Sequence, residues 1–425
     1  MGRIGRRGFV LAAAGTLAAL ATTGGAAARP AGLPAGAARR RRTPRTEFRG
    51  MWLATVANRD WPSAGGLTAA EQRAELLHHL DTAVARKLNA VLLQVRPTAD
   101  ALWPSPHEPW SQYLTGVQGQ HPGWDPLGTA VREAHLRGLE LHAWFNPYRV
   151  ATHTDPSRLV ADHPARVHPE WVLPYGGKLY YNPGIPEVRT FVQDAMMDAV
   201  GRYDIDAVHF DDYFYPYPVA GQVFDDDETY ARYGADFADK AAWRRDNIDR
   251  LVSEMADRIK KAKKAKTAKK DTSFGISPFG VWRNVATDPL GSDTSAGVQT
   301  YDDLHADVVK WVKQGWIDYV VPQLYWHIGF GPADYAKLLP WWSDVVRGTG
   351  VCLYAGEALY KAGDPAQPAP WQDPAELSRH LTLAATYPQV RGHCFFSAKE
   401  VTTDRIGAMA TVVADHYPTM VLPPA

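Results

Sequence analysis

Short β-rich segments alternate eight times with segments of helical periodicity along most of the chain. The predicted strands cover residues 47–56, 90–97, 139–147, 207–214, 273–279, 318–326, 351–359 and 391–397. The predicted helices cover residues 69–87, 125–137, 186–203, 236–266, 301–314, 332–347, 374–386 and 403–416. Several strands are nearly continuous apolar runs, as expected of parallel strands covered by helices. Eight such pairs predict an α/β chain whose residues 47–417 form a single (β/α)8 TIM barrel, followed by a C-terminal tail over 418–425.

An open, doubly wound sheet is the alternative that the same alternation allows. That fold usually carries a Gly-rich, phosphate-binding turn after its first strand, and residues 55–62 contain no Gly. Gly138 and Gly315 each separate a predicted helix from the next predicted strand, where a left-handed helix cap is expected. The sequence therefore favours the closed barrel.

The charge is distributed unevenly. The chain has 46 basic and 46 acidic residues, but residues 1–46 contain nine Arg and no acidic residue. Residues 47–425 consequently hold 37 basic and 46 acidic residues, a net charge of −9. Phosphate groups repel a body of that charge, so we expect no nucleic-acid partner.

The N-terminal segment has the features of an export signal. Arg6 and Arg7 precede an apolar, Ala-rich stretch that ends near Ala21 and is followed by small residues. This pattern predicts a twin-arginine-type signal peptide over residues 1–28, and residues 29–46 form a basic, Pro/Ala/Arg-rich linker. The apolar stretch is shorter than the ~20 residues that span a membrane. We expect a secreted, extracytoplasmic protein without stable membrane insertion, the alternative being a disordered tail that stays attached.

Polar and aromatic side chains gather where the predicted strands end. A buried parallel strand should be apolar, so this asymmetry predicts an enzyme whose site lies at the C-terminal face of the barrel. The longest intervals follow the third and fourth strands, and residues 149–185 show no clear periodicity. The candidate substrate-binding residues are Trp52, Arg96, Asn146, Tyr148, Tyr213, Arg283, Gln323, Tyr325 and Trp326.

Two adjacent carboxylates end the fourth strand. Neighbouring strand residues point to opposite faces, so we expect one of Asp211 and Asp212 to enter the barrel mouth and the other to hold a loop, a substrate hydroxyl or a cation. Burial among aromatic rings would raise the pKa of such a carboxyl and make it a general acid at neutral pH. In the alternative interpretation, the pair caps a turn or binds Arg96 or Arg149.

Glu357 ends the seventh strand, and carboxylates on strands four and seven would face each other across the barrel mouth. Two facing carboxylates suit glycoside cleavage, because one protonates the leaving oxygen while the other attacks the sugar or activates water. A structural ion pair is the alternative role of Glu357. The 15 Trp and 19 Tyr residues fit the same chemistry, because flat rings contact sugar faces, although plain packing would also use them.

The sequence predicts no metal site and no cofactor. The His residues show no H-E-x-x-H spacing, and neither a G-x-S-x-G motif nor a P-loop is present. The acidic run over residues 225–228 lacks the spaced ligands of a calcium loop. Cys352 and Cys394 are expected to be free buried thiols, with a disulfide between neighbouring strands as the alternative.

Six motifs in order resemble the glycosyl-hydrolase-like 10 family of bacterial exported proteins over residues 47–397. They are Phe48-Arg49-Gly50-Met51-Trp52, Val95-Arg96-Pro97, Trp144-Phe145-Asn146-Pro147-Tyr148, residues 209–216, residues 275–283 and Pro322-Gln323-Leu324-Tyr325-Trp326. The resemblance implies a TIM-barrel glycoside hydrolase related to the large retaining clan, and some relatives act on the glycan strands of peptidoglycan. The paired Asp motif with Tyr325 is also similar to hydrolases in which the substrate's N-acetyl group attacks.

We therefore expect an exported glycoside hydrolase that cleaves O-glycosidic bonds in peptidoglycan glycan strands or another N-acetylhexosamine-containing polysaccharide. Asp212 or Asp211 would be the general acid, with Glu357 as nucleophile or base, and the protein would associate with the cell wall. Two other classes remain open. A non-catalytic carbohydrate-binding barrel would keep the aromatic residues without needing the acid pair, and a metal-dependent hydrolase such as a deacetylase would lose activity with a chelator.

Overall fold

The computed structural model describes residues 46–268 and 271–424. The predicted signal peptide and all of the predicted linker except Thr46 lie outside the described residues. Among the described residues, no helix is both long enough and apolar enough to cross a membrane.

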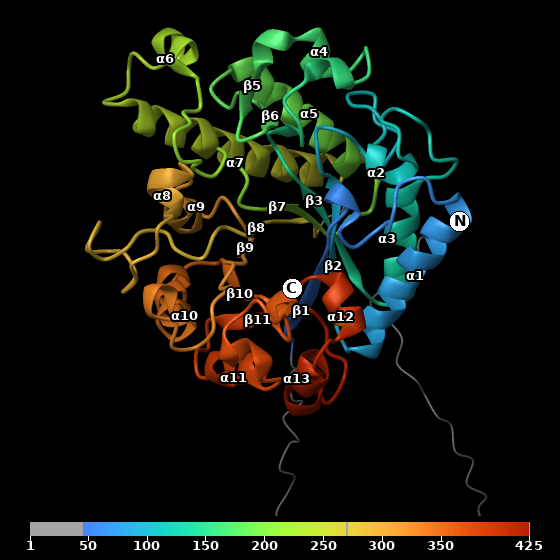
Figure 1. The fold of residues 1–425 in the computed structure, drawn as a ribbon, viewed down its shortest axis with the longest axis vertical. Coiled ribbons are helices and arrows are strands. Elements are labelled where there is room, and N and C mark those ends of the chain that lie inside the picture. The colour runs from blue at the N-terminus through green and yellow to red at the C-terminus, as the bar shows by residue number, and fades with distance from the viewer. Residues whose placement is uncertain (1–45, 269–270, 425) are drawn as a thin grey trace, which may run out of the picture. The chain divides into compact units, whose positions relative to one another are not determined.

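Eight parallel strands close into a barrel, as predicted. In chain order they are β1 (Phe48–Leu53), β2 (Ala90–Arg96), β3 (Glu140–Phe145), β7 (Ala207–Phe210), β8 (Ser273–Ile276), β9 (Tyr319–Val320), β10 (Cys352–Glu357) and β11 (Val390–Phe396). Each strand pairs with the next of this series, and β11 pairs with β1 to close the barrel. Seven of these strands fall within a predicted one, β11 begins one residue before its predicted start at 391, and helices surround the barrel (Figure 1).

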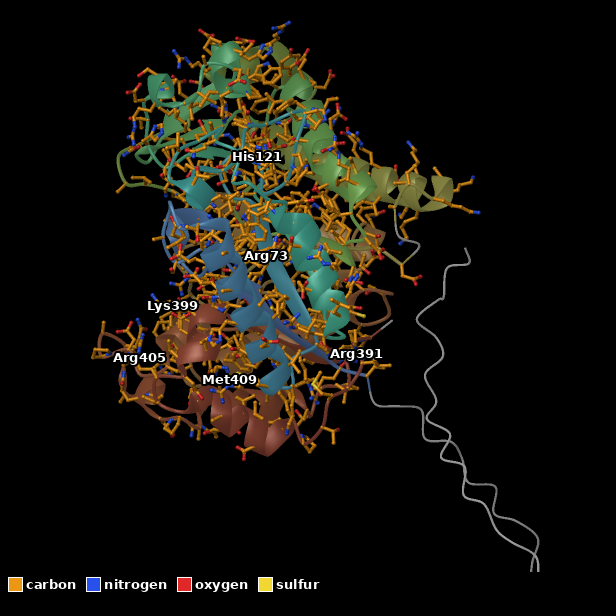
Figure 2. The ribbon with its side chains drawn as sticks, turned by 90° about the vertical axis from the view of Figure 1, so that its right-hand side faces the viewer. Arg73, His121, Arg391, Lys399, Arg405 and Met409 are labelled. Atoms are coloured by element: carbon orange, nitrogen blue, oxygen red, sulfur yellow. The ribbon has the colours of Figure 1, made fainter. Side chains whose placement is uncertain are left out.

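The longer helices surround the barrel, and short helices lie in the segments that connect them with the strands (Figure 1). In chain order the helices are α1 (Ala69–Ala85), α2 (Gln112–Thr115), α3 (Pro126–Leu136), α4 (Pro164–Val167), α5 (Pro186–Arg202), α6 (Asp227–Tyr233), α7 (Lys240–Ala265), α8 (Thr300–Asp303), α9 (Val308–Gln314), α10 (Tyr335–Val346), α11 (Glu376–Ala384), α12 (Ala398–Thr403) and α13 (Ala408–His416). Of these, α2, α4, α6 and α8 are the short helices of the connecting segments. Figure 2 shows α1, which carries Arg73, beside α12 and α13 at Lys399 and Met409. The first and last helices are therefore neighbours, as barrel closure requires.

Local signals fix several helix ends. The Thr68 side chain caps α1 by accepting a hydrogen bond from the Glu71 amide. The Glu71 side chain accepts one from the Thr68 amide, and the two bonds form a capping box. Gly138 and Gly315 have positive φ angles of 73° and 63°, as their cap positions predict. The predicted helix over 301–314 is instead two helices, because His305 has a φ of 52° and Asp307 starts α9 by accepting from the Lys310 amide.

The long segment after β3 holds structure that the sequence analysis missed. It forms a three-stranded antiparallel sheet of β4 (Arg149–Ala151), β6 (Lys178–Tyr181) and β5 (Val172–Tyr175), in that order. Gly176 and Gly177 join β5 to β6 with φ angles of 57° and 75°. A two-residue Gly-Gly turn is a hairpin signal, so this dipeptide could have located the sheet.

The barrel interior carries a column of polar contacts below its C-terminal mouth. The Tyr319 hydroxyl lies 2.9 Å from His142 Nδ1 and 3.1 Å from His209 Nδ1. His209 Nε2 in turn lies 2.9 Å from Ser277 Oγ and accepts from Trp52 Nε1 at 3.2 Å. Burial holds the pKa of His209 well below its ordinary value, so this ring is neutral. The column connects the barrel core to the residues at its mouth.

Both cysteines are free thiols, as expected. Cys394 is buried, whereas Cys352, which was also expected to be buried, is only partly so.

Candidate active site

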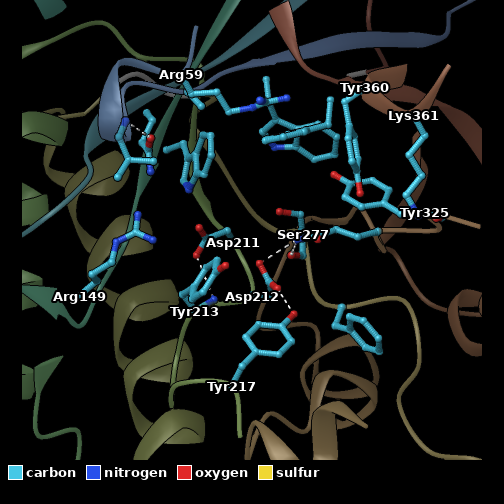
Figure 3. Close-up of a pocket in the computed structure, with 18 of the residues that line it drawn as sticks. Arg59, Arg149, Asp211, Asp212, Tyr213, Tyr217, Ser277, Tyr325, Tyr360 and Lys361 are labelled. Atoms are coloured by element: carbon cyan, nitrogen blue, oxygen red, sulfur yellow. Dashed lines mark hydrogen bonds between the residues drawn. The ribbon is translucent and has the colours of Figure 1, made fainter. Parts of the chain in front are cut away.

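A cavity of about 440 Å³ opens at the C-terminal end of the barrel (Figure 3). Each of the eight strands, or the loop that follows it, contributes at least one side chain to its wall. In chain order, one such side chain from each strand or following loop is Trp52, Gln94, Trp144, Asp211, Ser277, Gln323, Tyr360 and Phe396. The cavity therefore lies where the unequal loop lengths and the polar strand ends predicted it.

Asp211 and Asp212 both line this cavity and are only 4% and 6% exposed. The expectation that only one of them could enter the mouth is wrong. Strand β7 ends at Phe210, so the alternation of faces no longer applies to the next two residues. Figure 3 shows the two carboxylates together at the centre of the cavity.

Asp211 is held from the β3 side. Its Oδ2 accepts a hydrogen bond from Asn146 Nδ2, and its Oδ1 accepts from the Tyr213 amide at 3.1 Å. Asn146 Oδ1 accepts from Gln94 Nε2 and, at 3.0 Å, from Arg149 Nη2. These two donors fix the orientation of the Asn146 amide, which leaves its N–H group directed at Asp211.

Asp212 is held from the opposite side. Its Oδ2 accepts a hydrogen bond from the Tyr217 hydroxyl, and its Oδ1 accepts from Gln323 Nε2 at 2.9 Å. Gln323 Nε2 also donates to the Ser277 carbonyl oxygen at 3.0 Å, which fixes the direction of that amide. The donors on Asp212 stabilise its ionised form.

The two carboxyls cannot both ionise easily. Burial raises the pKa of Asp211, the charge of Asp212 raises it further, and Arg149 opposes the shift, so the pKa of Asp211 rises to about 7. Burial also raises the pKa of Asp212, while the bonds from Tyr217 and Gln323 lower it. The pair thus shares one proton near neutral pH, with Asp211 as its preferred site.

Glu357 does not reach the cavity, and the expectation that it faces the Asp pair is wrong. It is fully buried, with Oε2 2.8 Å from His380 Nδ1 and Oε1 3.0 Å from His393 Nδ1, and it accepts from the Tyr335 hydroxyl at 2.9 Å. Burial alone would raise the pKa of Glu357, but the charge and hydrogen bond of His380 and the bond from His393 lower it to about 2. Three partners enclose this carboxylate in a structural cluster.

Five of the predicted substrate-binding residues line the cavity: Trp52, Tyr213, Gln323, Tyr325 and Trp326. Asn146 acts on the cavity through Asp211. Ring contacts join several of the walls, including Phe279 to Trp326 at 5.3 Å and Tyr325 to Tyr360 at 5.8 Å between centroids. Flat apolar walls around a carboxyl pair fit the binding of a sugar ring.

The structure does not bring Arg96, Tyr148 or Arg283 into the cavity, which corrects their expected role. Arg96 is fully buried in a two-bond ion pair with Glu108, which includes an Nε–Oε2 distance of 2.6 Å. Tyr148 is fully buried in the core beneath the loops. Arg283 forms ion pairs with Asp288 in a loop and Asp302 in α8, so all three residues stabilise segments that surround the cavity.

The sequence analysis did not assign Arg59, Gln94, Tyr217, Ser277 or Lys361 to this site, although all five line the cavity. Gln94 lies near the end of a predicted strand, and Ser277 lies in the motif over residues 275–283, so their positions could have identified them. Tyr217 and Lys361 lie in loops beyond the strand ends, where no periodic pattern marks them. Their place in the cavity follows only from the folded loops.

No group of three or more His, Cys, Asp or Glu residues in ranges 46–268 and 271–424 is arranged to hold a metal ion.

The family model described as "Glycosyl hydrolase-like 10" matches residues 47–373. The chain belongs to the glycosyl hydrolase-like 10 family. It is 50% identical over 380 residues to "Glycosyl hydrolase YngK" of Bacillus subtilis (strain 168), covering 89% of this chain and 73% of that protein. It is 41% identical over 369 residues to "Glycosyl hydrolase DigH" of Escherichia coli (strain K12), covering 82% of each.

Solved structures with little sequence similarity share the fold of this family member. The PgaB (BpsB) glycoside hydrolase domain from Bordetella bronchiseptica aligns with a TM-score of 0.53 at 13% identity, covering 88% of this chain and 100% of that one. Alpha-L-fucosidase isoenzyme 2 from Paenibacillus thiaminolyticus aligns with a TM-score of 0.52 at 12% identity, covering 87% and 50%. With the family match, the protein is identified as a glycoside hydrolase with a TIM-barrel fold.

Proposed function

We propose that this glycosidase cleaves the bond beside an N-acetylhexosamine in a bacterial cell-wall glycan, with the substrate's own N-acetyl group as the nucleophile. One observation carries this proposal: Asp211 and Asp212 are the only carboxylates among the described residues that line the cavity. A two-carboxylate mechanism needs acid groups that flank the scissile bond. Asp211 and Asp212 are consecutive residues after one strand, and the third candidate, Glu357, is enclosed elsewhere.

The two Asp residues have different roles in this mechanism. Asp211 retains its proton near neutral pH and donates it to the leaving glycosidic oxygen. The acetamido oxygen attacks the anomeric carbon. Ionised Asp212 accepts a hydrogen bond from the acetamido N–H and stabilises the positive charge that develops on the acetamido group. Water then opens the cyclic intermediate while Asp211 accepts its proton. Tyr217 and Gln323 keep Asp212 oriented throughout.

The pKa shifts predict the pH dependence of turnover. Because the general acid must carry a proton, the rate is expected to fall as the pH rises through about 7, the pKa of Asp211. It is also expected to fall at acid pH, where Asp212 becomes protonated and can no longer stabilise positive charge. Steady-state rates across a pH series measure both limbs. A plateau that extends well above pH ~8 would contradict Asp211 as the acid.

The substrate class has a direct test. Wild-type protein incubated with peptide-free peptidoglycan strands, with a polymer of N-acetylglucosamine and with cellulose is expected to release N-acetylated oligosaccharides only from the first two, as seen by mass spectrometry. The acetamido group is required in this mechanism, and cellulose has none. Release of glucose oligomers from cellulose at a comparable rate would refute substrate assistance.

Export belongs to the same proposal, because a cell-wall glycan lies outside the cytoplasmic membrane. Arg6 and Arg7 precede the apolar stretch in the order of a twin-arginine signal. The Arg6→Lys/Arg7→Lys variant is expected to accumulate inside the cell at precursor length, measured by cell fractionation and intact-mass analysis. The Arg41→Lys/Arg42→Lys variant, altered in the proposed linker, is the matched control and should be exported normally. Equal export of both variants would exclude the twin-arginine route.

A further inference from the structure

Three cationic side chains line the active-site cavity: Arg59, Arg149 and Lys361. The charge of Arg149 acts on the Asp pair, where it lowers the pKa of both carboxyls. The charge of Arg59 is matched by Glu400, whose Oε2 lies 3.2 Å from Arg59 Nη2. Lys361 differs, since it forms no ion pair with any carboxylate in the part of the chain that the structure describes.

The described neighbours of the Lys361 ammonium group are a carbonyl oxygen and two aromatic rings, and none of them carries a negative charge. Its Nζ donates to the Tyr325 carbonyl oxygen at 2.6 Å, and the Tyr360 and Trp371 rings lie 5.8 and 5.7 Å away. An ammonium group has three N–H donors, and this carbonyl takes one. The side chain is half-buried, and partial removal of a charge from water costs free energy that a counter-charge offsets.

The position of Lys361 separates it from the reacting groups. Figure 3 shows it beside Tyr325 and Tyr360, on the side of the cavity away from Arg149. The Arg59 guanidinium also lies at the cavity wall, 4.8 Å from the Phe396 ring centroid, but Glu400 matches its charge. A sugar packed on these rings would present its substituents to Lys361 while its neighbour occupies the space above the Asp pair.

We propose that Lys361 binds a carboxylate carried by a substrate sugar adjacent to the one on which Asp211 and Asp212 act. One ammonium matches one negative charge, whereas a phosphate dianion would call for further cationic donors. The aromatic neighbours provide the surface for the sugar that carries this carboxylate. The inference rests on the proposed function and deepens it: the enzyme selects an acidic N-acetylated glycan over a neutral one.

The test measures binding, so that it does not depend on turnover. Full-length Asp211→Asn protein is titrated calorimetrically with peptide-free peptidoglycan oligosaccharides and with the same material after its carboxylates are converted to methylamides. The free acid is expected to bind about tenfold or more tightly, the effect of one charge-assisted hydrogen bond. Adding Lys361→Met should reduce the ratio of the two affinities toward one, while Lys361→Arg should keep it. Lys399→Met, on the exposed surface of α12, is the matched control and should also keep it.

Two results would overturn the inference: equal affinity for both forms in protein that retains Lys361, or a preference that persists with Lys361→Met. If Lys361→Met does not fold, the salt dependence of the original preference decides, because an ionic contact weakens as salt is added and a steric preference does not. Hydrolysis by wild-type protein is measured separately. Failure to cleave either form would refute the proposed function, and the binding ratio would still decide the role of Lys361.

Discussion

The Asp211→Asn variant is expected to hydrolyse glycan strands at least ~100-fold more slowly than the wild type, because general acid catalysis of the leaving group is lost. The loss should be much smaller on an aryl N-acetylhexosaminide with a strongly acidic phenol as leaving group, which departs without a proton. The comparison of the two substrates therefore isolates the acid role of Asp211. Asn keeps the size of the side chain, and its Oδ1 can still accept from the Tyr213 amide, whereas its Nδ2 cannot accept from Asn146.

The Asp212→Asn variant separates the second role from the first. Its rate is expected to fall by a similar ~100-fold or more on both substrates, because the developing positive charge loses its counter-charge whichever group departs. Asp225→Asn is the matched control, since Asp225 is exposed and outside the cavity. Near-normal turnover in both cavity variants would show that the Asp pair takes no part in the mechanism. If Asp211→Asn loses the same factor on both substrates, Asp211 is not the general acid.

Replacing Glu357 is expected to affect stability far more than chemistry. The Glu357→Ala variant should lose about 3–5 kcal/mol of unfolding free energy, because it removes the carboxylate between the buried His380 and His393 and leaves the His380 ring only its hydrogen bond with Glu376. Burial would lower the pKa of His380, but the charge of Glu357 outweighs this and raises it, so both groups are charged in the folded protein. Denaturant unfolding of the variant and the wild type measures the difference.

The pH range of this effect follows from the two shifts. The Glu357 contribution is complete above its ordinary pKa of 4.5 and is lost as the pH falls toward 2. The His380 contribution is complete below its ordinary pKa of 6.5 and is lost as the pH rises through its raised value. The largest difference is therefore expected between pH 4.5 and 6.5. Glu170→Ala, at an exposed position, is the control and should change stability little.

The Glu357→Gln variant separates the two mechanisms considered from the sequence. If Glu357 has only a structural role, folded protein of this variant should turn over at close to the wild-type rate. A nucleophile or base at this position would instead make it lose at least ~100-fold. Such a loss in protein shown to be folded would contradict the assignment of Glu357 to the buried cluster.

The barrel could be predicted from sequence because its strands are buried apolar runs separated by capped helices. The start of each strand was placed within one residue by its own composition, although the strands predicted to end at 214 and 326 end at Phe210 and Val320. Gly138 and Gly315 marked two of the helix ends. The small sheet of β4, β5 and β6 was missed because its strands have only three or four residues and do not alternate between buried and exposed positions. The division of α8 from α9 depends on the positive φ at His305, and a His residue in the sequence does not predict a positive φ.

The site was predictable only in part, for a physical reason. A polar residue at a strand end can face the cavity or support the loops, and the choice depends on partners that are distant in the chain. Arg96 lies outside the cavity because its guanidinium forms a buried ion pair with Glu108. Glu357 was enclosed by residues of α10 and α11 and by His393 of β11. Asp211 and Asp212 could be found together, but their shared orientation depends on where β7 stops.

The central claim is that the substrate's own acetamido group is the nucleophile. Varying the acyl group of the substrate tests this claim most directly. Turnover is measured on aryl hexosaminides that differ only in the number of fluorine atoms on the N-acetyl methyl group. Each fluorine withdraws electrons from the amide oxygen, so kcat is predicted to decrease progressively from the acetyl to the trifluoroacetyl substrate. A rate that does not change across the series would contradict attack by the substrate's own acetamido group.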